Sequence, residues 1–540
     1  MSAAHRWLLA VVSLALGVVV VLVAGVDLAV ASEAAPPTPV VDISNTPRLA
    51  ETEEYICADP SNPQHLIMGS NVTEPLTPQG LPAPLPGVNG DGIVDIAVYS
   101  SQNGGRSWTA SRLPEGGLGS DALPLPPIAS VPSEFANAGN VVNADQSCAF
   151  DRHGNAYYAS ANFSTALPGD SRVRVWRSTD GGRSFGTPVI AASSVRDSLA
   201  NKPFIATLDR PFLAVDNSGG PHDGTVYVGY EDFVEQTVLN PVQEVRSTDH
   251  GKTFSSPVRV DDPAQDTQAD PREMPSVDGH GNLYVVYDVG GNQEGGPLTA
   301  PLTLMVSRSS DGGQSFSHFV VDRNVHRPTD PDEAEPGFVE FISAIAADPR
   351  RSGRVAVAWP EATSAGSSKI VLRYSTDGGK RFSPRIDVAT GPGASGNQHD
   401  HVSVTYLPDG RLAVVWRDRR CCGGTFADPY EVYSRIMNTT AGGTLTAGPE
   451  IPVSIVPTAP STSVRGVAPD EYLSSVGTSL GLGVTWNEFR GSLTDDVFRL
   501  IAVPAPASLP TRRRAGREPR HHRTRRRSTR PRHRARQRST

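Results

Sequence analysis

The sequence predicts an all-β fold in which short antiparallel strands form the four-stranded blades of a ring, a β-propeller. Three observations lead to this prediction. A turn motif recurs five times, an alternating strand of apolar and aromatic residues recurs seven times, and 51 Gly and 47 Pro are spread along the 540 residues. Gly and Pro distributed in this way indicate many turns between short strands. Self-similarity at a fixed period indicates a repeat architecture.

The turn motif begins with Ser and ends with an aromatic residue seven positions later. Its Ser and Asp side chains can accept hydrogen bonds from turn amides, and the Gly that all copies share allows a positive φ. Each copy is therefore predicted to be a hairpin whose aromatic residue returns to the sheet. The copies are Ser101–Trp108, Ser178–Phe185, Ser247–Phe254, Ser309–Phe316 and Ser375–Phe382.

This motif resembles the Asp box, or BNR repeat, of sialidase-like proteins, which reads S-x-D-x-G-x-[ST]-[FW]. Five copies at regular spacing support the resemblance. In the families that share the box, it is structural and lies away from the active site. The resemblance therefore implies no catalytic role for the box aspartates.

The alternating strand defines the number of repeats, because it is present even where the box is not. A shorter strand precedes each copy, so each unit has four strands, with the box between the third and the fourth. The sixth unit has a degraded box near Ser434–Gly443. The copies are His65–Asn71, Ala156–Asn162, Thr225–Asp232, Asn282–Asp288, Arg354–Glu361, Arg411–Asp418 and Gly481–Glu488.

The seventh unit has only three strands, the last at Asp496–Val503. Pro39–Ser44, near the start of the chain, resembles the fourth strands of the other units. We expect it to complete the last blade, which would close the ring without leaving a free edge. Seven blades are favoured, and six are the alternative because sialidases have six.

Charge and hydropathy divide the chain into three segments. Residues 1–31 are expected to be a signal peptide, since Arg6 precedes the apolar run Trp7–Val26 and small residues follow at Ala29–Ala31. This predicts a secreted protein, and an uncleaved membrane anchor is the alternative. Residues 32–510 form the propeller. Residues 511–540 carry 14 Arg and one acid, and they are expected to be a disordered tail.

The remaining 510 residues carry 35 Lys and Arg (49 − 14) against 56 Asp and Glu (57 − 1). This net charge of −21 argues against nucleic-acid binding by the folded body. A glycan or another cell-surface ligand is the expected partner, and the protein is expected to be a monomer.

Strand order places the starts of the first strands and the ends of the second strands on one face, opposite the boxes. Acidic residues gather at this level, among them Glu53, Asp145, Asp209, Glu273, Asp400 and Asp418, together with Arg210, Arg272 and Arg417. One interpretation is a ligand site at the mouth of the central channel, where carboxylates bind a cation or sugar hydroxyls or perform acid–base catalysis. The other is that these acids cap loops and pair with the arginines.

The sialidase resemblance suggests roles for some of these residues. Sialidases hold the substrate carboxylate with three arginines and use a Tyr nucleophile paired with Glu, plus an Asp acid/base. The corresponding candidates are Tyr472, Glu273 and Asp209 for catalysis. Substrate binding would fall to Arg210, Arg272, Arg417, Asp400 and Asp418.

The arginine motif F/Y-R-I-P of sialidases has only the poor match Pro47-Arg48-Leu49-Ala50. The hypotheses are therefore a secreted, exo-acting glycoside hydrolase of sialidase-like type and, as the alternative, a propeller that binds glycan or protein without catalysis. The missing motif favours the alternative, or a scaffold that only retains the fold.

No cofactor is required by either hypothesis, and calcium is the one candidate metal. Asn89, Asp91 and Asp95 place oxygen ligands at the alternating spacing of calcium loops, although a plain turn explains them as well. Cys57 and Cys148 occupy matching positions of two repeats, so they are expected to form a disulfide in an exported chain. Cys421 and Cys422 are adjacent, and a bond between them is the remaining pairing.

Overall fold

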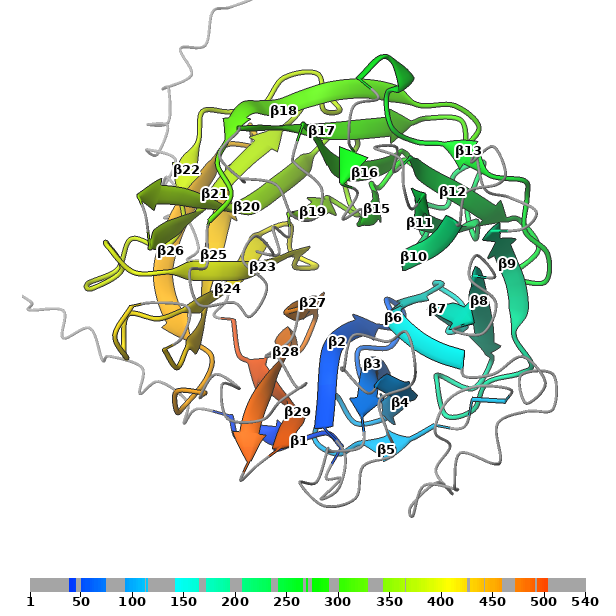
Figure 1. Ribbon diagram of the computed structural model, residues 1–540, viewed down its shortest axis with the longest axis horizontal. Helices are drawn as coiled ribbons and strands as arrows, with labels where there is room; N and C mark the ends of the chain where they lie inside the picture. Colours follow the sequence, from blue (N-terminus) through cyan, green and yellow to red (C-terminus); the bar gives the residue numbers. More distant parts are fainter. Residues whose placement is uncertain are drawn as a thin grey trace, which may run out of the picture.

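The computed structural model forms a ring of seven β-sheets around a central axis (Figure 1). This confirms the predicted propeller and its seven blades, and the six-bladed alternative is wrong. The described residues are 38–44, 50–73, 93–111, 113–114, 141–164, 171–194, 206–234, 241–265, 269–270, 274–290, 301–328, 343–364, 366–424, 428–440, 442–458, 472–490 and 493–503.

The strands of each blade follow one another from the axis outward. Blade 1 contains β2 (Ala50–Ala58), β3 (Leu66–Thr73), β4 (Ile93–Ser101) and β5 (Thr109–Ala110). Blade 2 contains β6 (Val141–Phe150), β7 (Ala156–Ser164), β8 (Ser171–Ser178) and β9 (Val189–Ser193). Blade 3 contains β10 (Ala206–Val215), β11 (Val226–Val234), β12 (Val242–Ser247) and β13 (Val258–Arg259).

Blade 4 has its innermost strand in two parts, which both pair with the next strand. It contains β14 (Ala269–Asp270) and β15 (Pro275–Val277), then β16 (Leu283–Val289), β17 (Leu302–Ser309) and β18 (Ser317–Val325). A 3-10 helix at Pro263–Gln265 precedes it. Blade 5 contains β19 (Ala344–Ala347), β20 (Val355–Ser364), β21 (Ser367–Ser375) and β22 (Ile386–Asp387).

Blade 6 contains β23 (His399–Tyr406), β24 (Leu412–Asp418), β25 (Glu431–Thr439) and β26 (Leu445–Pro452). Blade 7 contains β27 (Ser474–Thr478), β28 (Gly481–Arg490) and β29 (Leu493–Ile501), and its outermost strand is β1 (Val41–Asp42) from the other end of the chain.

The pairing of β1 with β29 closes the ring as predicted. The two strands run antiparallel, with Val41 opposite Phe498 and Asp42 opposite Val497, and the amide of Ile43 donates to the carbonyl of Asp496 at 2.9 Å. Figure 1 shows the blue β1 beside the orange β29 at this seam. The two ends of the propeller thus belong to one sheet, so blade 7 has four strands and β29 is covered on its outer side.

A buried carboxyl group lies at the same seam. Glu51 of β2 accepts hydrogen bonds from the Tyr99 hydroxyl at 2.8 Å and from the Asp496 amide at 3.0 Å. Burial raises the pKa of Glu51 to about 7, although these hydrogen bonds oppose the rise. Blade 1 and blade 7 are therefore joined through a carboxyl group that the fold holds away from water.

The hydrophobic core is divided among the contacts between neighbouring blades. Each pair of adjacent sheets encloses its own cluster of buried apolar side chains, including the pair formed by blades 7 and 1. The alternating strands supply it, because successive side chains on a strand point toward opposite neighbours. Trp359, Trp416 and Trp486 lie fully buried on the second strands of blades 5, 6 and 7.

The Asp boxes form hairpin turns held by their own side chains. In the second copy, Ser178 Oγ accepts the Gly182 amide at 2.9 Å and Asp180 Oδ1 accepts the Ser184 amide at 3.0 Å. The same serine-to-glycine contact recurs in the other four copies. Each box Asp is thus engaged within its own turn, on the face opposite the bulges described below.

The shared box Gly also allows adjacent blades to approach each other closely. A Cβ atom at Gly182 would lie 2.1 Å from Cγ2 of Ile67 in blade 1, and one at Gly105 would lie 2.0 Å from the ring of Phe498 in blade 7. Both glycines have positive φ, +87° and +83°. The position therefore requires Gly for its backbone conformation and for the absence of a side chain.

A further contact between blades recurs two positions before the box serine or its structural equivalent. In five blades, the side chain there donates to a backbone carbonyl near the outer strand of the preceding blade. The donor side chains differ, so the sequence does not reveal the repeat. The pairs are Trp176 with Pro114, Ser307 with Val260, Arg373 with Val321, Arg435 with Val388 and Arg499 with Val453.

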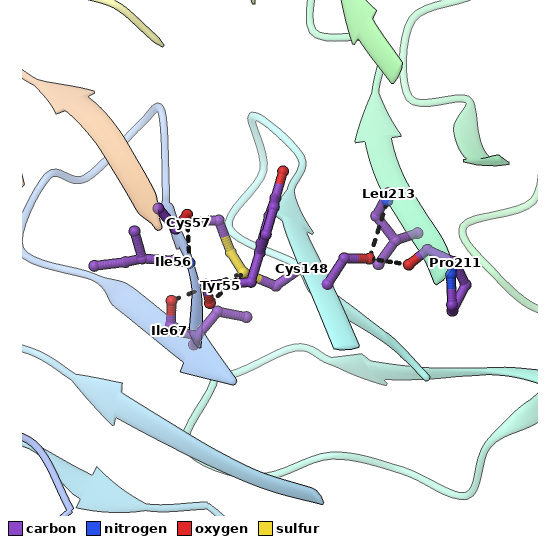
Figure 2. Close-up of a disulfide and its surroundings, with 9 residues drawn as sticks. Tyr55, Ile56, Cys57, Ile67, Cys148, Pro211 and Leu213 are labelled. Carbon is purple, nitrogen blue, oxygen red and sulfur yellow. Dashed lines mark hydrogen bonds between the residues drawn. A yellow bond between two sulfur atoms is a disulfide. The ribbon is translucent and has the colours of Figure 1, made fainter. Parts of the chain in front are cut away.

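Cys57 of β2 and Cys148 of β6 form a disulfide between the innermost strands of blades 1 and 2, with Cα atoms 5.9 Å apart (Figure 2). Beside it, Ser147 Oγ donates to the Pro211 carbonyl at 2.6 Å and accepts the Leu213 amide at 3.0 Å, which connects blade 2 to blade 3. Cys421 and Cys422 are joined to each other.

Within the described ranges, no helix has both the length and the apolar character needed to cross a membrane. The predicted signal peptide, residues 1–31, and the predicted tail, residues 511–540, lie outside these ranges.

Replacing Gly182 with Ala should destabilise the protein more than replacing Gly396, which has φ of +88° but nothing within 4 Å of the added methyl. Both variants carry a left-handed alanine, which costs about 1–2 kcal/mol. Only Gly182→Ala also forces apart two packed blades, at a further cost of about 1–3 kcal/mol. Denaturant unfolding of the two variants measures the difference, and equal losses would show that the close contact is unimportant.

Candidate functional site at the channel mouth

The innermost strands of four blades are interrupted by a β-bulge at the same level. The register shifts by one residue between Thr52 and Tyr55 in β2, Ala144 and Ser147 in β6, Asp209 and Phe212 in β10, and Asp400 and Val402 in β23. A bulge redirects the side chains next to it, and bulges are common beside active sites. In blade 3 the bulge contains Pro211, which has no amide hydrogen to lose from the ladder.

Each of these bulges contains a titratable residue with a positive φ. The values are 59° for Glu53, 52° for Asp145, 48° for Arg210 and 42° for His401. Such a conformation costs a non-glycine residue about 1–3 kcal/mol, and it persists only where the surrounding structure enforces it. Strained residues of this kind gather at functional sites. The repeated strain thus marks this end of the channel.

Tyr472, just before β27, reaches across the ring from blade 7. Its hydroxyl donates to Asp145 Oδ1 in blade 2 at 3.2 Å, and its ring meets Phe212 of blade 3 edge-on with centroids 5.8 Å apart. Phe212 also contacts Tyr55 of blade 1, at 5.6 Å, and Met274 of blade 4 packs against the same group. Blades 7 and 3 lie on opposite sides of the axis (Figure 1). These four side chains therefore form an apolar plug in the channel.

The acidic residues beside Tyr472 interact with one another. Burial raises the pKa of Asp145 well above its ordinary value, and the charges of Asp209 and Glu53 raise this pKa further. A hydrogen bond with Asp209 acts in the same direction, whereas Arg210 partly offsets it. The mutual repulsion of carboxylates in such contact favours the protonated form of Asp145. We call Glu53, Asp145, Asp209, Arg210 and Tyr472 the mouth cluster.

The mouth cluster has the components of acid–base chemistry. Asp145 and Asp209 are two interacting carboxyl groups, and the Tyr472 hydroxyl already donates to Asp145. Asp145, Asp209 and Arg210 are half-buried, so each keeps some contact with solvent. A carboxyl group whose pKa is raised by burial and by neighbouring charges is suited to act as a general acid.

Blade 6 contributes a second charged group at this level, which is paired internally. Asp400 accepts a hydrogen bond from His401 Nδ1 at 2.8 Å and forms an ion pair with Arg419. Burial alone would raise the pKa of Asp400, but Arg419, His401 and Arg417 outweigh it and hold this pKa well below the ordinary range. Burial and Arg417 lower the pKa of His401 to about 4, so this imidazole is neutral at physiological pH.

The other charged residues of blade 6 also have partners within the fold. Arg417 donates to the Tyr472 carbonyl at 2.9 Å and lies over the ring of Tyr430 at 4.8 Å. Asp418 accepts from Trp416 Nε1 at 3.0 Å and pairs with Arg420 at 2.5 Å. Arg417 also fixes the backbone of Tyr472, the residue that crosses the channel.

The structure brings together some of the residues predicted from the sequence. Tyr472, Asp209 and Arg210 belong to the mouth cluster, whereas Arg417, Asp400 and Asp418 belong to the paired group of blade 6. Glu273, Arg272, Asn89 and Asp91 lie outside the described residues, as does the side chain of Asp95 in β4. Their roles remain predictions.

Asp145 is the partner of Tyr472 that the sequence did not single out. It was one of several acids at the starts of first strands, and the resemblance pointed to Glu273 instead. The available signal was positional, since Glu53, Asp145 and Arg210 occupy corresponding bulges of three consecutive blades. Among the residues that the structure describes, no group of three or more His, Cys, Asp or Glu is arranged to hold a metal ion.

No protein-family model matches the chain, and neither does any curated protein sequence. Solved structures match the chain with low identity and low TM-scores. A Dyadobacter fermentans protein of unknown function is 17% identical with a TM-score of 0.43, over 66% of this chain and 95% of that one. A Hadza microbial sialidase is 11% identical with a TM-score of 0.43, over 76% and 75%.

The α-L-arabinofuranosidase of Fusarium graminearum, solved with arabinobiose, is 14% identical with a TM-score of 0.40, over 78% of this chain and 98% of that one. At these identities and TM-scores, no activity is carried over from these proteins to this chain.

The Asp145→Asn variant should gain stability relative to the wild type as the pH rises. The pKa of Asp145 is higher in the folded protein than in the unfolded chain, so the unfolded chain releases its proton first and wild-type stability falls between the two pKa values. Asn has no carboxyl group to titrate, so the variant does not undergo this fall in stability. Thermal unfolding should therefore give a difference in Tm near zero at pH 3.5 that grows toward pH 8.

The matched control is Asp387→Asn, which removes an exposed acid on the outer strand β22. A Tm difference for Asp145→Asn that stays constant from pH 3.5 to pH 8 would contradict the elevated pKa.

Proposed function

We propose that this is an exported glycoside hydrolase that cleaves glycans at the channel mouth. The observation that carries the proposal is the hydrogen bond from Tyr472 to Asp145, inside a group of strained and mutually interacting acids. Export is inferred from the N-terminal segment of the sequence. A site on the face of the channel mouth agrees with the repeat structure. The Asp boxes lie on the opposite face and use their polar groups within their own turns.

In the proposed reaction, Tyr472 is the nucleophile. Its oxygen attacks the anomeric carbon while its proton passes to Asp145, and Asp145 passes its own proton to Asp209. Asp209 gives that proton to the departing glycosidic oxygen. In the second step Asp209 takes a proton from water and the water oxygen displaces Tyr472 from the sugar, while Asp145 returns a proton to the Tyr472 oxygen and regains one from Asp209.

The remaining members of the mouth cluster would bind the sugar. Carboxylate oxygens of Glu53 and the guanidinium group of Arg210 are an acceptor and a donor for sugar hydroxyls. Their strained backbone holds them in place before the ligand arrives, which reduces the entropy lost on binding. The disulfide and the hydrogen bonds of Ser147 fix blades 1, 2 and 3 relative to one another at this point.

One observation favours a second candidate function, a propeller that binds glycan without cleaving it. The side chain of Tyr472 belongs to the apolar plug and the residue is only 4% exposed. A nucleophile must be reached by the anomeric carbon, whereas a plug residue needs only to pack. The two functions make opposite predictions for removal of the Tyr472 hydroxyl.

Turnover of a panel of 4-methylumbelliferyl glycosides by the full chain tests the proposal. Tyr472→Phe should lower kcat by about 10²–10⁴-fold, the usual range for loss of a group that transfers protons or attacks in the transition state. The ring that packs on Phe212 is retained, so Tm should change little. Asp145→Asn should reduce kcat by a comparable factor.

The control is Tyr433→Phe, which removes a hydroxyl that donates to Glu431 on β25, away from the mouth cluster. Its kcat should equal that of the wild type. If the wild type cleaves no glycoside in the panel but binds glycans, the non-catalytic function replaces the hydrolase. Full activity in Tyr472→Phe would exclude Tyr472 as the nucleophile.

A further inference from the structure

Recognition of an acidic sugar needs guanidinium groups that are open to a ligand carboxylate. Among the described residues at the mouth level, Arg417 is 1% exposed and Arg419 is 3% exposed. Arg417 is committed to the Tyr472 carbonyl and the Tyr430 ring, and Arg419 to Asp400. Arg420 is half-buried but is paired with Asp418 and Glu450. Arg210 is also half-buried, with Nη1 3.9 Å from Glu231 Oε2. The blade 6 arginines are therefore occupied by contacts within the fold and are not open to a ligand.

The groups that surround Arg210 are mainly acceptors. Glu53, Asp145 and Asp209 interact with one another, and Glu231 lies beside Arg210. The Arg210 guanidinium offsets part of the negative charge here without reversing its sign. A ligand carboxylate in this position would meet like charges after losing its own water, which is strongly unfavourable.

Two neighbouring side chains also show that hydrogen-bond donors are scarce at this level of the channel. Glu54 follows Glu53 in the bulge of β2, is fully buried, and has no hydrogen-bond partner on either carboxylate oxygen within the described structure. Gln146 follows Asp145 in the bulge of β6, and its fully buried side-chain oxygen also has no donor there. Because both side chains are fully buried, a ligand does not reach them. The acceptors open to ligand O–H groups at this level are the half-buried carboxylates of Asp145 and Asp209.

We propose that the mouth cluster selects neutral glycans, whose sugars carry hydroxyls and no carboxylate, sulfate or phosphate. This substrate class rests on the proposed glycan-acting function and narrows it. It departs from the sialidase resemblance, in which three arginines hold a carboxylate. The specificity-determining residues are Glu53 and Asp209, which oppose a negative charge on the ligand.

Binding of the full chain to an array that pairs neutral oligosaccharides with sialylated, uronic-acid and sulfated forms of the same cores measures this selectivity. Each neutral form should bind at least about tenfold more tightly than its acidic partner at low salt. The ratio should fall as salt is added, since part of the repulsion is screened. Wild-type turnover of 4-methylumbelliferyl N-acetylneuraminate should be far below that of neutral 4-methylumbelliferyl glycosides.

Glu53→Gln and Asp209→Asn each remove one negative charge from the mouth cluster, so both should raise binding of acidic glycans relative to neutral ones. Asp387→Asn removes the same charge from the outer strand of blade 5 and should leave the ratio unchanged. Tm values for the three variants check that each is folded. If only one of Glu53→Gln and Asp209→Asn folds, that variant alone is compared with Asp387→Asn.

Tighter binding of the acidic forms would overturn this substrate class while leaving the glycan-acting function intact. Unchanged ratios in both mouth variants would overturn the role of Glu53 and Asp209. Binding of no glycan at all would overturn the proposed function, and the substrate class with it.

Discussion

The close approach of each blade to the face of its neighbour is the constraint on which the rest of the structure depends. A single four-stranded sheet cannot bury its faces alone, and here each interface between blades has its own apolar cluster. The box glycines allow the approach, and the recurring bonds to backbone carbonyls, such as Arg435 to Val388, hold it. Closure by β1 extends the same contact to the seam, where buried Glu51 joins blades 7 and 1.

A ring held in this way can sustain unfavourable local structure at its axis. Four bulges keep titratable residues at positive φ, and Asp145 sits where burial and neighbouring charges oppose its ionisation. Neither feature stabilises the fold, and both would relax if the inner strands were free to move. The disulfide between Cys57 and Cys148 lies directly below the bulges of blades 1 and 2 along their strands. Stability from the blade contacts thus supports a strained, charged channel mouth.

Much of the architecture could be predicted from the sequence because it depends on local signals. The box needs Ser, Asp and Gly at fixed spacing to form its turn, so its five copies mark five blades. The alternating strand gives the count of seven, and the three-strand seventh unit implied closure by Pro39–Ser44. The site was less predictable. The sequence placed Arg417 at the correct level of its blade. A bulge at His401 changes the alternation of side chains on the neighbouring strand, and the sequence could not show that Arg417 lies against the ring of Tyr430. The contact of Tyr472 with Asp145 spans 327 positions and crosses the ring, so no local pattern encodes it.

The central claim is that ligands bind at the channel mouth, opposite the Asp boxes, through the mouth cluster. A crystal structure of the full chain with a bound neutral oligosaccharide tests it most directly. The account predicts a sugar ring hydrogen-bonded to Asp145 or Asp209, with its anomeric carbon facing the Tyr472 hydroxyl. An oligosaccharide bound on the face of the boxes or on the outer strands, with none at the mouth, would contradict it.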